Sequence, residues 1–182
     1  MPYLSATVEL IVSRKRTAFI FLLLVNLPLI IFTWNNGNYS DDYQFLNLYF
    51  TKQLISPFSR VLLDLLEPKT DGHFTPVYYL FNTLIYKVYP SPQFFHFIVV
   101  LCHIGTACMV FLIITHTHKD RSLALLSGIL FSLSYCVCFK ALTWNCFHSH
   151  VTNTFTGLVA LYYVLQYFER KRQIHLLYIF LF

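Results

Sequence analysis

Two adjacent carboxylates, Asp41 and Asp42, follow closely after a long apolar run in this sequence. Carboxylates hydrate strongly and repel one another, so a pair at the end of an apolar segment calls for an explanation. A carboxylate held at the boundary between lipid and water can take a proton from an incoming hydroxyl group. Acidic residues can also simply mark where an apolar helix meets water. Charge placement by itself favours this second, structural explanation.

Two polar segments contribute further titratable and aromatic side chains that the predicted topology places at the same membrane face. The first contributes Asp64, Glu67, Asp71 and His73. The second, residues 140–150, contributes Lys140, Trp144, Asn145, His148 and His150. Cationic and imidazole groups can hold a departing phosphate through charge-assisted hydrogen bonds. Aromatic rings could stack on a sugar ring or on a lipid.

Histidines also bind metals, but their spacing here does not favour a shared ion. His148 and His150 are two residues apart, so on a helix they point to different faces. We interpret this pair as water-facing residues at the start of a helix. His96 and His103 are seven apart within one apolar run, and we expect them to pack against a neighbouring helix. No metal site is predicted from the histidines.

The composition is that of a membrane protein. Hydrophobic residues make up 57% of the 182 and aromatic residues 19%, whereas only 12% are charged. Soluble domains carry about twice that charged fraction. The net charge of +5 is clustered, which indicates membrane topology and no nucleic-acid partner. The five cysteines have no framework spacing, which argues against a disulfide-stapled secreted domain.

Four apolar runs are long enough to cross a bilayer, which needs about 20 residues. These predicted spans are 17–34, 94–115, 122–139 and 151–168. A fifth run, 173–182, is too short to cross, so we expect the chain to be the N-terminal part of a longer protein. Pro28 is expected to kink the first span.

The basic clusters predict the topology. Lys and Arg favour the cytoplasmic side, so the cluster at 14–16 predicts a cytoplasmic N-terminus. Residues 76–90 would reach only about 22 Å as a helix and carry an apolar stripe, so we predict that they lie in the membrane plane. The clusters near 119–121 and 170–172 then also fall inside, while 35–93 forms one long outer loop and 140–150 a second. Residues 43–55 are a further candidate for an interfacial helix.

The predicted fold class is therefore all-α, a polytopic membrane helix bundle with in-plane juxtamembrane helices in its first outer loop. The order of its motifs resembles the front of GT-C membrane glycosyltransferases. The resemblance is to the protein O-mannosyltransferase and aminoarabinose-transferase group, and especially to the tetratricopeptide-containing transmembrane mannosyltransferases. It runs over roughly residues 17–168 and depends on four stretches: DDYQF, GHFTPVYYLFN, FFHFIVVLCHIGTACMVFLI and ALLSGILFSLSYCVCFKALTWNCFHSHVTNTF.

This resemblance implies an enzyme that moves a sugar from a polyprenyl-phosphate donor in the membrane lipid to an outer acceptor, which is a protein, lipid or glycan. Asp41 would be the catalytic base, and Asp42 would orient it or contact the acceptor. His73, Lys140, Trp144, His148 and His150 would contact the substrates. His73 stands where the family usually has Lys or Arg, and the segment 140–150 carries Lys and His where relatives often carry Glu or Arg. Paired carboxylates also suit a divalent cation, although oxygen ligands alone do not establish one.

Two other classes of membrane protein remain alternatives. A transporter fragment should show charged or helix-breaking residues in the middle of its spans. These spans show little of that kind beyond histidines, Pro28 and Gly105. A non-catalytic membrane subunit would have no need of an outer acidic pair.

Overall fold

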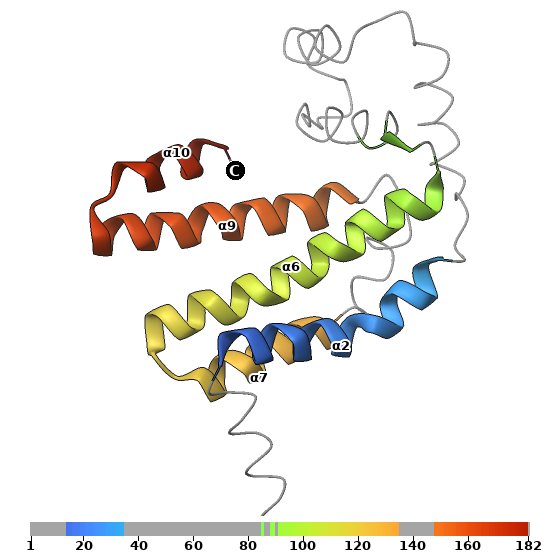
Figure 1. Ribbon diagram of the computed structural model, residues 1–182, viewed down its shortest axis with the longest axis horizontal. Helices are drawn as coiled ribbons and strands as arrows, with labels where there is room; N and C mark the ends of the chain where they lie inside the picture. Colours follow the sequence, from blue (N-terminus) through green and yellow to red (C-terminus); the bar gives the residue numbers. More distant parts are fainter. Residues whose placement is uncertain (1–13, 35–84, 86–87, 90, 135–147, 182) are drawn as a thin grey trace, which may run out of the picture.

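The structure is a computed structural model, and it describes residues 14–34, 85, 88–89, 91–134 and 148–181. Every regular element among these residues is a helix, which confirms the all-α prediction for this part of the chain. The helices are α2 (Lys15–Trp34), α6 (Pro92–His118), α7 (Arg121–Leu133), α9 (His148–Arg170) and α10 (Gln173–Leu181) (Figure 1).

Helix α6 is the centre of the bundle and contacts α2, α7 and α9, while α10 packs on α9. Helices α2 and α7 run in one direction, and α6 and α9 run in the other (Figure 1). This arrangement gives the bundle two ends. The basic end holds residues 14–16, 119–121 and 170–172, and the far end holds Trp34, Ser91, Ser134 and His148.

The predicted spans 17–34, 94–115 and 151–168 all lie within helices, and each of these three helices is longer than predicted. Helix α6 begins at Pro92 because Ser91 caps it, accepting a hydrogen bond from the Phe94 N–H at 3.5 Å. Helix α9 begins at His148, three residues before the predicted span 151–168, so His148 and His150 lie at the start of a helix as expected. The incomplete run 173–182 is helical as α10 up to Leu181.

Helix α7 ends earlier than the predicted span 122–139. It begins after Asp120, whose Oδ1 accepts hydrogen bonds from the N–H groups of Ser122 at 2.9 Å and Leu123 at 3.0 Å. It ends at Leu133, and Ser134 is its C-cap. Thirteen residues reach about 20 Å, which is less than the roughly 30 Å hydrocarbon core. Residues 135–139 lie outside the described part of the chain.

Within the described residues, Gln93–His118 is the one helix long and apolar enough to cross a membrane, judged by length and composition. The predicted in-plane segment 76–90 and the candidate helix 43–55 lie outside the described residues, apart from three positions in the first. Of these three, Ile85 and Val88 are helical, and Ile85 is buried whereas Val88 and Tyr89 are exposed.

Two apolar clusters hold the helices together. Near the basic end, Ala18 and Leu22 of α2 pack with Phe111 of α6 and with Ala124 and Leu125 of α7. Near the far end the cluster is formed by Leu29, Ile85, Phe95, Val99, Val100, Ile104 and Val151. His96 and His103 of α6 face inward as expected, because both are buried.

Glycines let the helices approach closely at two points. A Cβ atom at Gly105 of α6 would lie 2.6 Å from the Phe155 ring of α9. A Cβ atom at Gly128 of α7 would lie 3.2 Å from Leu22 of α2 and 3.3 Å from the Ala107 carbonyl oxygen of α6. Helix packing in this bundle therefore depends on small residues, as is usual for helices in lipid.

We predict that Gly105→Ala destabilises the bundle by about 1–3 kcal/mol, because the added methyl group overlaps the Phe155 ring. Gly157→Ala is the matched control, since a Cβ atom there meets nothing within 4 Å. It should be neutral or stabilising by up to about 1 kcal/mol, because alanine favours a helix. Unfolding in detergent micelles measures both changes, and equal stability of the two variants would contradict the close α6–α9 contact.

Candidate functional site

The residues that the sequence predicted for the site fall largely outside the described part of the chain. This holds for Asp41, Asp42, His73, Lys140 and Trp144. The other two predicted residues, His148 and His150, lie in the first turn of α9. His150 is exposed, as expected for a histidine at the start of a helix.

The described helices bring the positions that flank the predicted site residues in the sequence to one end of the bundle. Helix α2 ends at Trp34, seven residues before Asp41, and Ser134 is six residues before Lys140. Both positions lie at the far end, where α9 begins with His148 (Figure 1). Seven residues span at most about 25 Å, which limits how far Asp41 can be from the end of α2.

A polar contact inside the bundle was not predicted from the sequence. Asn26 of α2 is buried, and its Nδ2 donates to Ser132 Oγ of α7 at 2.8 Å and to the Leu22 carbonyl at 2.7 Å. Ser132 Oγ in turn donates to the Gly128 carbonyl at 2.9 Å. An asparagine within an apolar run was the signal that could have found this contact, since a polar group there needs a partner on another helix.

His103 of α6 meets the same serine from a third helix. Its ring stacks on Phe131 of α7 with centroids 5.0 Å apart, and it forms a hydrogen bond with the Ser132 backbone. Asn26 Oδ1 and His103 Nε2 are buried and have no hydrogen-bond partner among the described residues. We define Asn26, His103 and Ser132 as the buried polar cluster. It has no carboxylate or ammonium group, so it suits hydrogen bonding between helices better than acid–base chemistry.

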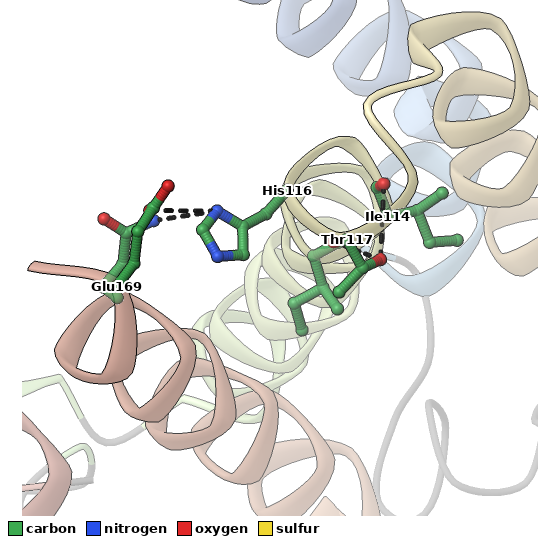
Figure 2. Close-up of polar contacts among 6 residues, drawn as sticks. Ile114, His116, Thr117 and Glu169 are labelled. Atoms are coloured by element: carbon green, nitrogen blue, oxygen red, sulfur yellow. Dashed lines mark hydrogen bonds and ion pairs between the residues drawn. The ribbon is translucent and has the colours of Figure 1, made fainter.

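A second polar contact joins α6 and α9 close to the basic end. His116 Nδ1 lies 3.3 Å from Gln166 Nε2 and 3.7 Å from Glu169 Oε2 (Figure 2). The two contacts require different protonation states of His116 Nδ1. Gln166 can donate a hydrogen bond to this nitrogen only when the nitrogen carries no proton, whereas the ion pair with Glu169 requires the nitrogen to be protonated. Because Glu169 is 58% exposed, the ion pair contributes little stability.

Among the described residues, no group of three His, Cys, Asp or Glu side chains lies close enough together to hold a metal ion. No family model matches the chain, and neither a curated protein nor a solved structure matches it.

We predict that Asn26 and Ser132 are energetically coupled. Asn26→Leu and Ser132→Ala should each destabilise the bundle, and the double variant should cost less than the sum of the two. The coupling should be about 0.6 kcal/mol and at most about 1.7 kcal/mol, as for other hydrogen bonds between membrane helices. Thr154→Ala is the control, because the Thr154 hydroxyl donates within its own helix, to the His150 carbonyl at 2.6 Å. Additive effects of Asn26→Leu and Ser132→Ala would contradict the contact.

Proposed function

We propose that this chain forms the first spans of a multi-pass membrane glycosyltransferase, which moves a sugar from a polyprenyl-phosphate donor to a protein, lipid or glycan acceptor at the outer membrane face. The supporting observation is the separation of charge along the bundle. Every described Lys and Arg lies at the basic end, and the polar segments with the predicted site residues join the helices at the far end.

The exposed faces of α2 and α7 favour membrane embedding. Each carries a stripe of large aliphatic side chains at helical spacing. On α2 these are Ile20, Leu23, Leu24, Leu27 and Ile31, and on α7 they are Leu123, Leu126, Leu130 and Leu133. Contiguous apolar stripes are costly in water but suit contact with lipid chains. Hydroxyl groups in α6 and α7 also donate within their own helix, as from Thr106 to the Cys102 carbonyl at 2.8 Å, which keeps polar groups satisfied away from water.

The basic end would then face the cytoplasm, because Lys and Arg accumulate on that side. The far end would face outward and carry the acidic pair. In this proposal Asp41 takes the proton from the acceptor hydroxyl as that oxygen attacks the anomeric carbon. The polyprenyl phosphate leaves with negative charge, which His73, Lys140, His148 or His150 could stabilise. Asp42 positions Asp41 or contacts the acceptor.

The buried polar cluster bears on the alternative of a transporter fragment. Asn26 lies in the middle of α2, two residues before Pro28, as a transporter site would require. However, its amide is already bonded to Ser132 and Leu22. This cluster contains no charged side chain, so we favour a packing role. A non-catalytic membrane subunit is the other alternative. The effect of substituting Asp41 and Asp42 on glycosyl transfer distinguishes it from an enzyme.

The proposed orientation predicts the accessibility of introduced cysteines. In a background without the five native cysteines, Lys119→Cys should react with a membrane-impermeant maleimide only after the cytoplasmic side is opened. Tyr89→Cys is the matched position, because Tyr89 is also exposed and precedes the start of α6 at the far end. It should react from outside in intact cells. Labelling of Lys119→Cys from outside would overturn this orientation.

We predict that Asp41→Asn abolishes glycosyl transfer and leaves membrane insertion intact. Asparagine has nearly the same size but cannot accept the proton, and loss of a general base slows a reaction by roughly 10²–10⁴-fold. The measurement is transfer from a polyprenyl-phosphate sugar by the protein at its full native length, normalised to expression. Asp42→Asn should reduce the rate less.

Asp64→Asn is the control, because it removes an acidic group from the same predicted outer loop. It should leave the rate close to that of the unmodified protein. Wild-type rates in Asp41→Asn would exclude the catalytic-base role, and wild-type rates in the variant lacking both Asp41 and Asp42 would favour a non-catalytic subunit.

A further inference from the structure

The basic end carries far more positive than negative charge. Its exposed cationic residues are Arg14, Lys15, Arg16, Lys119, Arg121, Arg170, Lys171 and Arg172. They come from the start of α2, the turn between α6 and α7, and the turn between α9 and α10, so segments far apart in sequence share one end of the bundle (Figure 1). Such a surface attracts anions more strongly than any single cluster would.

The two described acidic residues at this end do little to offset that charge. Asp120 accepts two backbone hydrogen bonds as the N-cap of α7. Glu169 lies 3.7 Å from His116. Two carboxylates against eight Lys and Arg side chains leave most of the positive charge of the basic end uncompensated.

Two of the lysines occupy backbone positions that favour glycine. Lys119 follows α6 with a φ of 57°, and Lys171 follows α9 with a φ of 52°. Left-handed residues at helix C-termini are usually glycine, because a Cβ atom is strained there. A cation near a helix C-terminus gains from the helix dipole. On α9 that gain does not require Lys171, because Arg170 is already in the last turn of this helix. Lysines at both strained positions therefore point to a use for their charge.

The setting of Lys171 suits the boundary between lipid and water. Its Nζ lies 5.2 Å from the centre of the Phe168 ring and 5.8 Å from that of Tyr167. Aromatic rings and lysines are typical of the headgroup level of a bilayer, where the rings contact the lipid and the ammonium group reaches the phosphates.

We propose that the basic end binds the headgroups of anionic phospholipids in the leaflet that it faces. Lysine would attract the lipid phosphate as a point charge, and arginine would bind it through paired N–H donors. The proposal rests on the multi-pass membrane placement proposed above and does not depend on glycosyl transfer. It also concerns the end of the bundle opposite to the proposed donor site.

The test is binding of fluorescently labelled phosphatidylglycerol to the protein in neutral detergent micelles, with labelled phosphatidylcholine as the comparison. The unmodified protein should bind phosphatidylglycerol more tightly, and 1 M salt should remove the preference because it shortens the screening length to about 3 Å. Lys119→Gly combined with Lys171→Gly should weaken phosphatidylglycerol binding about 30-fold, since each basic residue contributes about fivefold. Thermal stability should be unchanged or higher, because glycine relieves the backbone strain.

Lys119→Arg combined with Lys171→Arg keeps the charge at the same strained positions and should retain binding. If the glycine variant is less stable, the pair Arg14→Gln and Arg172→Gln decides, because both residues are exposed and lie outside the helices. The proposal is overturned if this pair, or a stable glycine variant, binds as tightly as the unmodified protein. It is also overturned by equal binding of the two lipids, or by complete displacement of the lipid by millimolar inorganic phosphate, which would indicate a site for free anions.

Discussion

The close packing of α6 against three other helices is the constraint on which the described structure depends. Gly105 brings α6 against Phe155 of α9, and Gly128 brings α7 against both Leu22 and Ala107. In the proposed membrane placement, lipid would supply no hydrophobic force between helices, and contact would come from dispersion and hydrogen bonds at short range. Small residues permit that short range. The hydrogen bond between Asn26 and Ser132 lies beside the same contact and adds direction to it.

The turns at the basic end follow from this packing. Helices α6 and α7 are joined by Lys119 and Asp120 alone, so α7 must fold back along α6. Lys119 adopts a left-handed backbone conformation at this turn, and Asp120 caps α7. Helices α9 and α10 repeat the arrangement with Lys171 and Arg172. The same short turns that reverse the chain also gather the positive charges on one surface, so chain reversal and charge separation have a common origin.

The two ends of the bundle therefore differ in how the chain connects the helices. The basic end is formed by helix termini and two-residue turns, which are held by caps and by the contact of His116 with Gln166 and Glu169. The far end gives rise to the long polar segments that carry the acidic pair. The glycosyltransferase proposed above would use this asymmetry, with its chemistry on one side of the membrane and the orienting charges on the other.

The sequence by itself determined the helical class, the helices at 17–34, 94–115 and 151–168, and the inward placement of His96 and His103, because apolar runs and their periodicity are local properties of the chain. It placed the start of α7 correctly but not its end at Leu133, since helix C-termini depend on capping contacts. It also identified Asp41 and Asp42 as candidate site residues from their residue type, and both lie outside the part of the chain that the structure describes. It further predicted, from the preference of Lys and Arg for one side of a membrane, that the three basic clusters lie on the same side. Only the tertiary structure decided that Asn26, His103 and Ser132 meet. That outcome depends on which helices become neighbours, and this is set by contacts between residues as far apart in sequence as Asn26 and Ser132.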